Sequence, residues 1–245
     1  WFMNRIRDGY CTVPNPFNRK QVSRISLAPE DVEVIVFWTR NPKPLLSSLP
    51  ELDELGYKYY FQFTLMNNPS FIETNKVSLS AAIKTFQELA NLIGSEQVIW
   101  RYDPIVFSDD TDVDFHLQQY GDIAEQLSGC TSRCVISFVD RYAKNNRRFQ
   151  KIEIEKDINF YDFEDMPKVF SNFLPSIGEI ASQYKMQLFS CAEPYDLESY
   201  GINHGKCIDD DYIEEVLGIE VGHQKDSGQR EVCGCVKSRD IGMYD

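Results

Sequence analysis

Short, almost uniformly apolar segments alternate along this chain with longer segments in which apolar residues recur every three or four positions. The first kind predicts strands at 34–39, 59–65, 97–102, 133–139 and 186–191. The second kind predicts helices at 44–55, 78–93, 113–127, 163–184 and 209–217. Strands that are apolar on both faces and alternate with helices are typical of parallel βαβ units, so the pattern predicts an α/β fold with helices covering the sheet.

The number of strands favours a TIM-barrel-like (β/α) fold, either closed or partial. An open, doubly wound sheet is the alternative, because periodicity does not separate open from closed sheets; no Gly-x-Gly-x-x-Gly turn follows an early strand.

Both ends look truncated, since the chain opens inside an amphipathic run and stops at Asp245 soon after Cys-Gly-Cys. With no repeat or linker in view, we expect one domain over 1–245, with 219–245 as a cysteine-bearing tail.

Composition limits the class of protein. The 245 residues are 42% hydrophobic and 26% charged, as in one globular domain. We expect a cytoplasmic protein without a membrane segment, because neither a long apolar stretch nor a signal peptide is present. A net charge of −13 argues against a broad nucleic-acid surface, although a local basic groove stays open. The seven cysteines are unevenly spaced, which favours reduced thiols or metal ligands over a disulfide framework.

Polar side chains gather where the predicted strands end, which is where parallel α/β folds place their sites. We expect Arg101, Asp103 and Glu193 to be catalytic. We expect a further set to bind a cofactor: Arg40, Asn41, Gln62, Thr64, Ser137 and Asp140. An Arg-Asp pair suits a carboxylate or phosphate ligand but also closes barrel mouths structurally. Gln62 and Thr64 could equally form a polar layer satisfied by water, and Asn-Pro and Glu-Pro steps can be simple turns.

The cysteines divide by position. Cys130 and Cys134 flank the amino end of a strand and Cys11 lies in an irregular stretch, so all three are expected to be structural. Cys191 ends the fifth predicted strand, Cys207 lies in the loop after it, and Cys233 and Cys235 follow in the tail. These last four thiols could converge as metal ligands, since thiolates favour zinc or iron–sulfur clusters; unpaired free thiols are the alternative.

Several segments together resemble one known family. They are WFMNRIRDGYC, NPFNRKQVSRISL, IVFWTRNPKP, YFQFTL, VIWRYDPI, CVISFVD, CAE, HGKCID and CGCVKSRDIGMYD. They resemble the bacterial domain-of-unknown-function family 1848 over nearly the whole chain. The resemblance implies a barrel related to radical S-adenosylmethionine proteins, with a C-terminal cysteine cluster. It implies that Cys233 and Cys235 belong to that cluster and that a further Cys-x3-Cys-x2-Cys run lies just beyond Asp245.

The leading hypothesis is therefore an iron–sulfur enzyme of radical S-adenosylmethionine type, with a [4Fe-4S] cluster and a small-molecule or nucleoside-type substrate. A second hypothesis is a metal-free or zinc-dependent barrel hydrolase or lyase, in which Asp103, Asp140 and Glu193 do acid–base work. A third is a nucleic-acid or nucleoside-binding module with a structural cluster, for which the acidic balance allows a single flipped base.

Overall fold

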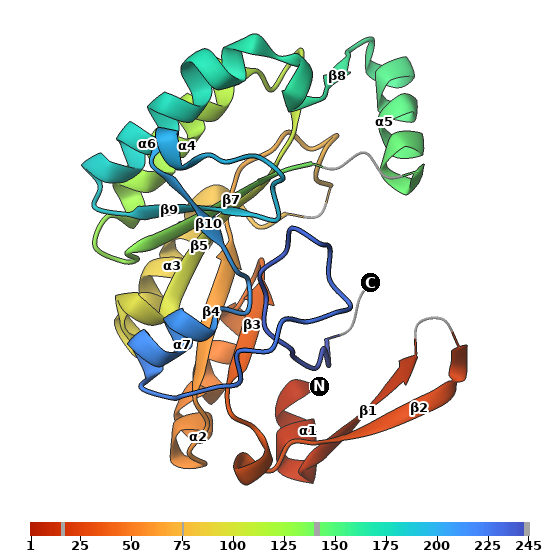
Figure 1. The fold of residues 1–245 in the computed structure, drawn as a ribbon, viewed down its shortest axis with the longest axis vertical. Helices are drawn as coiled ribbons and strands as arrows, with labels where there is room; N and C mark the ends of the chain where they lie inside the picture. Colours follow the sequence, from red (N-terminus) through yellow and green to blue (C-terminus); the bar gives the residue numbers. More distant parts are fainter. Residues whose placement is uncertain (16–17, 75, 140–142, 243–245) are drawn as a thin grey trace.

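A six-stranded parallel sheet forms the centre of the protein (Figure 1). The fold is that of a computed structural model that describes residues 1–15, 18–74, 76–139 and 143–242. The strand order is β10-β9-β7-β5-β4-β3. The strands are β3 (Ile35–Thr39), β4 (Tyr59–Thr64), β5 (Val98–Ile105), β7 (Arg133–Phe138), β9 (Gln187–Cys191) and β10 (Ile202–Gly205). Five of the six match the predicted strands within a few residues, because their apolar runs are near-continuous; β4, β5 and β7 are buried on both faces.

Most helices cover one face of this sheet. They are α2 (Leu49–Glu54), α3 (Leu79–Ile93), α4 (Val113–Leu127) and α6 (Leu174–Gln183). Their apolar stripes pack on alternate strand residues such as Phe61, Trp100 and Ile136 to form the main core. Common capping residues set the bounds of α3. Ser78 caps its start by accepting from the Ala81 amide at 3.4 Å, and Gly94 ends it with a φ of 96°.

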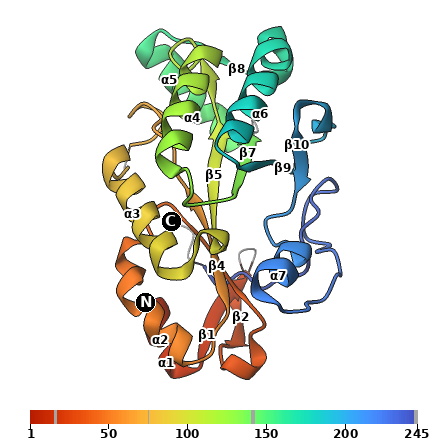
Figure 2. The same cartoon turned by 90° about the vertical axis from the view of Figure 1, so that its left-hand side faces the viewer.

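The opposite face of the sheet is covered by α7 (Asp210–Leu217) and by the tail that follows it (Figure 2). The strand residues between those of the main core face this way. Tyr60, Ile99 and Val135 pack there against Tyr212 and Ile213 of α7 in a second, smaller core. The sheet is therefore the middle of three layers.

The predicted closed barrel is not found. Within the described residues, β3 and β10 each have one sheet neighbour, so the sheet is open at both edges. The strands nevertheless lie side by side in chain order, without the reversal that defines a doubly wound sheet. The architecture is a mixed α/β fold with a sequentially ordered parallel sheet.

The first helix corresponds to the amphipathic run at the start of the chain, whereas the other elements were not predicted from the sequence. α1 (Phe2–Asp8) precedes a hairpin of β1 (Tyr10–Asn15) and β2 (Asn18–Ser26), which extends beyond the sheet in Figure 1 and contains Cys11 as a buried strand residue, so placing Cys11 in an irregular stretch was wrong. α5 (Ala143–Lys156), with the short pair β6 (Phe107–Ser108) and β8 (Phe160–Tyr161), forms the far end of the molecule. β10 is a strand where the sequence pattern predicts a loop.

Two predicted helices are interrupted. The first begins as a 3-10 helix at Lys43–Ser48 before α2, and the second divides into a 3-10 turn at Phe163–Asp165, a π-helical turn at Val169–Phe173 and α6. Remaining 3-10 turns lie at Pro29–Asp31, Ser95–Gln97 and Glu198–Tyr200. In the described part of the chain, every helix is too short or too polar to cross a bilayer.

Candidate metal centre at the carboxyl edge of the sheet

The face of the sheet that meets α7 becomes polar toward the carboxyl ends of β4 and β5. Alternation along β4 turns Tyr60, Gln62 and Thr64 to this face, and Thr64 pairs in register with Arg101 of β5. All of these side chains are buried, so each needs a polar partner. Tyr60, Gln62 and Arg101 find partners in the segment that follows β10.

Cys207 is the residue that this polar face holds. The Tyr60 hydroxyl donates to the Cys207 carbonyl at 2.9 Å, and the Gln62 amide nitrogen donates to the same oxygen. The Arg101 Nη1 donates to the Cys207 sulfur at 3.2 Å. Main chain and side chain of Cys207 are thus both fixed against the two central strands.

Four thiols meet around Cys207. Cys191 at the end of β9 brings its sulfur to 3.0 Å from that of Cys207. From the tail, the Cys235 sulfur accepts the amide of Cys207 at 3.1 Å and that of Ile208 at 3.4 Å. Cys207, Cys233 and Cys235 form one buried cluster with the half-buried Cys191 packed against it. The structure thus brings the four thiols together, while their role as metal ligands stays a prediction.

Two glycines allow these segments to approach closely. A Cβ on Gly205, which lies beside Cys191 in the sheet, would be 2.8 Å from the Ser190 carbonyl oxygen. A Cβ on Gly234, between the two tail cysteines, would be 3.1 Å from the Lys206 side chain. A larger residue at Gly205 would push β10 away from β9 and would move Cys207 with it.

The surroundings favour thiolate in part of this cluster. Hydrogen bonds from the Cys207 thiol and from the amides of Cys207 and Ile208 lower the pKa of Cys235 to about 5. The Cys207 hydrogen bond and the Arg101 charge lower the pKa of Cys191 to about 7. Thiol hydrogen bonds with Cys191 and Cys235, for which Cys207 has a single proton to give, raise the pKa of Cys207, and burial raises the pKa of Cys233 to about 11. The low-pKa thiols are ready metal ligands, because metals bind the thiolate form.

Arg101 is itself enclosed. It is 1% exposed, and its Nη2 donates to Asp103 at 2.5 Å while its Nε lies 3.1 Å from both oxygens of that carboxylate. Nη1 also donates to Gln62 Oε1 at 2.6 Å. The ring of Trp38, at the end of β3, lies 4.1 Å from the guanidinium carbon and donates to Thr64 at 3.4 Å.

A hollow of about 350 Å³ lies next to the thiols. Ser190 and Val232, the chain neighbours of Cys191 and Cys233, line it together with Glu193, Tyr195 and His204. Glu193 accepts the Phe138 amide at 2.9 Å, which joins the loop after β9 to the end of β7. The hollow has the size of a small-molecule site.

A family model described as "Domain of unknown function (DUF1848)" matches residues 1–245. The chain belongs to the DUF1848 family. The resemblance inferred from the sequence segments is therefore confirmed. No curated protein matches the chain.

The remaining predicted cofactor residues of this DUF1848 chain lie in different surroundings. Arg40 pairs with Glu73, and Asn41 Oδ1 accepts the Lys43 amide at 3.3 Å in the turn after β3. Ser137 is half-buried on β7, and Asp140 lies outside the described residues. Cys134 is fully buried at the amino end of β7, with its pKa raised by burial to about 12, while Cys130 is half-buried nearby.

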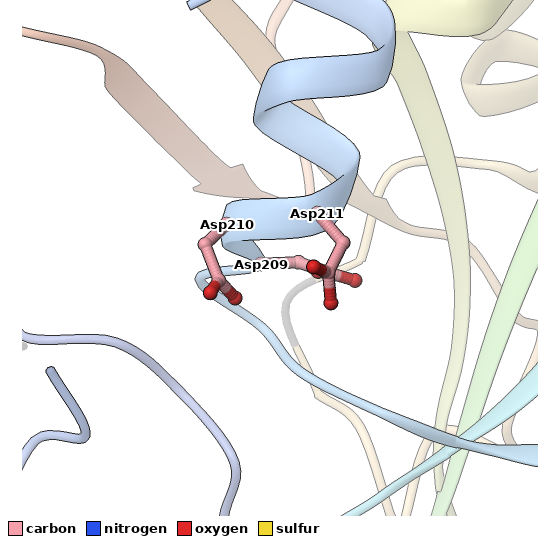
Figure 3. Close-up of side chains that lie close together, drawn as sticks. All are labelled: Asp209, Asp210 and Asp211. Atoms are coloured by element: carbon pink, nitrogen blue, oxygen red, sulfur yellow. The ribbon is translucent and has the colours of Figure 1, made fainter. Parts of the chain in front are cut away.

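Three consecutive acids at the start of α7 form a second close group in the DUF1848 chain. Figure 3 shows the carboxylates of Asp209, Asp210 and Asp211 near one another at the first turn of the helix. Each of them already has a basic partner. Asp209 pairs with Arg133 at 2.5 Å; Lys206 contacts Asp210 at 2.6 Å and Asp211 at 2.8 Å; and His223 contacts Asp210 at 2.7 Å. These contacts, together with the favourable interaction of acids with the positive end of the helix dipole, explain why three acids lie at the start of α7.

Two residues of the thiol site in this DUF1848 chain were missed in the sequence. Tyr60 and Trp38 lie inside apolar strand runs, where aromatic residues usually indicate core. The available signal was the alternation of side chains along each strand, because every second residue faces the same side of the sheet. It places Tyr60 on the face of Gln62 and Thr64.

Proposed function

We propose that this chain is an iron–sulfur protein and an enzyme of the radical S-adenosylmethionine type. Three thiolates drawn from Cys191, Cys207, Cys233 and Cys235 would bind the cluster, because an enzyme of this type needs one iron left open to S-adenosylmethionine. The observation that carries the proposal is the convergence of these four thiols, from strand ends and from the tail, at the carboxyl edge of the sheet. The donor set fits the group, since soft thiolate ligands select iron–sulfur clusters and zinc.

The residues around the thiols have separable tasks. The tail closes over Cys207 through Cys235 and through the Val236 amide, which donates to the Ile208 carbonyl at 3.1 Å, and this limits access of water. Arg101 supplies positive charge beside a group of thiolates. When bound, a cluster of this type supplies the electron that cleaves S-adenosylmethionine and yields a radical able to abstract hydrogen.

The adjacent hollow is the proposed place for S-adenosylmethionine or substrate. Glu193, predicted to be catalytic from its place at a strand end, lines it. Arg101, Asp103 and Gln62 contact one another and Cys207, so their proposed role is to support the thiols. Polar groups around a hollow of this size are what a small, partly charged ligand requires.

Iron and sulfide analysis, with visible absorption, tests the proposal on the full-length protein purified anaerobically. We expect roughly four irons per chain for a [4Fe-4S] cluster. The double variant Cys233→Ala, Cys235→Ala should lose most of this iron, whereas Cys130→Ala, a half-buried cysteine outside the cluster, should retain it. A wild-type protein that binds no iron after anaerobic reconstitution would overturn the proposal. With iron present, release of 5′-deoxyadenosine from S-adenosylmethionine tests the reaction type.

A second candidate is a zinc-dependent enzyme, in which Glu193 and Asp103 do acid–base work. One distance favours it: the Cys191 and Cys207 sulfurs lie 3.0 Å apart. Two thiolates on a tetrahedral zinc with bonds of about 2.3 Å lie roughly 3.8 Å apart, so a single ion requires only a small separation of the thiols. Zinc without iron or sulfide in the same analysis would favour this candidate.

A further inference from the structure

The contact between Arg101 and Cys207 joins a fixed positive charge to a thiol of the cluster. Arg101 Nη1 lies 3.2 Å from the Cys207 sulfur, inside a sheet face where Arg101 is 1% exposed. At this burial, solvent screens the charge little, and a charge-assisted hydrogen bond is strong. The nearby carboxylate of Asp103 opposes the charge from 2.5 Å.

Gln62 fixes the direction of this contact. Its Oε1 accepts from Arg101 Nη1 at 2.6 Å, and its amide nitrogen donates to the Cys207 carbonyl. Guanidinium, glutamine and cysteine thus form a closed ring of contacts. Trp38 covers the guanidinium at 4.1 Å. Such enclosure holds the N–H group on the sulfur.

We propose that Arg101 sets the reduction potential of the metal centre held by Cys207 and its neighbouring thiols, with Asp103 as its counterweight. The inference rests on the proposed function. Reduction adds negative charge to a thiolate-bound centre, and a hydrogen bond and positive charge at Cys207 stabilise that charge. Reduction potentials of iron–sulfur clusters follow net charge and hydrogen bonds to sulfur. Arg101 therefore raises the potential and Asp103 lowers it.

Removing the positive charge and removing the negative charge should shift the midpoint potential in opposite directions. Arg101→Gln removes the charge and should shift the midpoint potential to a more negative value. Asp103→Asn leaves the guanidinium without its carboxylate and should shift it to a more positive value. Arg101→Lys keeps the charge but loses the fork geometry and should lie between wild type and Arg101→Gln.

The measurement is an anaerobic redox titration of the full-length protein, followed by visible absorption and electron paramagnetic resonance, after iron and sulfide analysis of each variant. Arg133→Lys is the matched control, because Arg133 also forms a buried ion pair on this sheet, with Asp209 at 2.5 Å, and stacks on Phe189. Its potential should stay near that of the wild type.

The outcomes separate this inference from the proposed function. Shifts of opposite sign in Arg101→Gln and Asp103→Asn support it. Unchanged potentials in both variants, with iron and sulfide retained, would overturn the role of Arg101 alone. If Arg101→Gln loses its iron, the direction of the shift is judged from the other two variants: the midpoint potential of Arg101→Lys should be more negative than that of the wild type, and that of Asp103→Asn more positive. An iron-free wild-type protein would overturn the proposed function and this inference with it.

Discussion

At the scale of single residues, His116 shows how burial sets a protonation state away from the candidate site. It is fully buried in α4, with Nδ1 2.8 Å from the Tyr102 hydroxyl and Nε2 3.0 Å from the Val106 carbonyl oxygen. Burial lowers the pKa of His116 to about 4. The unfolded chain takes up this proton below about pH 6.5, whereas the folded protein does so only near pH 4. Stability from His116 is therefore full at neutral pH and is lost as the pH falls through this window.

His116→Gln should remove this pH dependence. The free energy of unfolding in urea should fall more in the wild type than in the variant between about pH 7 and about pH 4.5. His223→Gln is the control of opposite sign. A hydrogen bond to Asp210 raises the pKa of His223, so its contribution is present at low pH and is lost as the pH rises through that raised pKa. Equal losses in wild type and His116→Gln would contradict the prediction.

The candidate site was partly predictable from single residues. The positions of Cys191 and Cys207 near strand ends, and of Cys233 and Cys235 in the tail, indicated which thiols could converge. An Arg101–Asp103 pair was one of the alternatives read from the sequence. The sequence did not indicate that Arg101 would also donate to Gln62 and to a sulfur, because these contacts depend on how close the segment after β10 comes to β4 and β5. That approach depends on Gly205, a position whose need for glycine becomes visible only in the folded sheet.

At the scale of elements, α6 lies unusually close to the chain that follows β9. A Cβ built on Gly178 would be 2.3 Å from the Tyr200 carbonyl oxygen, which belongs to backbone and cannot turn aside. Gly178→Ala should therefore separate α6 from this turn and lower the free energy of unfolding by about 1–3 kcal/mol, the usual cost of overpacking. Chemical denaturation followed by circular dichroism measures it.

Gly121 in α4 provides the matched control. It is also a helical glycine, but a Cβ there would meet nothing within 4 Å. Gly121→Ala should stabilise the protein by up to about 1 kcal/mol, because alanine is the better helix former. A Gly178→Ala variant as stable as Gly121→Ala would show that the turn at Tyr200 moves without cost.

Elements with a clear hydrophobic pattern were predicted from the sequence, and elements with a weak pattern were missed. α4 was predicted with its observed bounds, since its apolar residues keep a helical spacing and Asp112 caps it by accepting the Phe115 amide at 2.9 Å. α5 was missed because its sequence AKNNRRFQKIEIEK is mostly polar, and the described part buries little more than Phe149 and Ile152. The hairpin of β1 and β2 was missed because the alternation of apolar and polar residues along its strands is weak.

At the scale of the whole molecule, sequence periodicity gave the layers and the parallel sheet, but not its closure. Both a barrel and an open sheet need apolar strands alternating with helices. The difference lies in whether the first and last strands meet, which depends on strand number and tilt rather than on any local pattern. Here the face that a closed barrel would enclose is covered by α7 and the tail instead.

The attachment of the tail to the rest of the protein can be tested. Residues 219–242 hold to the body through Cys233 and Cys235, through the Val236 amide on the Ile208 carbonyl at 3.1 Å, and through the Val232 carbonyl, which lies 3.0 Å from His204 Nε2. Removing the two thiols should raise the population of states with the tail detached. Exposed trypsin sites at Arg230, Lys237 and Arg239 report this population, because cleavage needs a locally unfolded segment.

Limited trypsin digestion followed by mass spectrometry should therefore cut the tail of Cys233→Ser, Cys235→Ser several-fold faster than that of wild type, while the sheet and its helices survive. Cys130→Ser should behave as wild type, since Cys130 lies at the other end of β7. Equal rates would mean that backbone contacts alone hold the tail. A further slowing of wild-type cleavage after iron loading would link the layer to the proposed centre, because a ligand that binds only the closed form stabilises it by mass action.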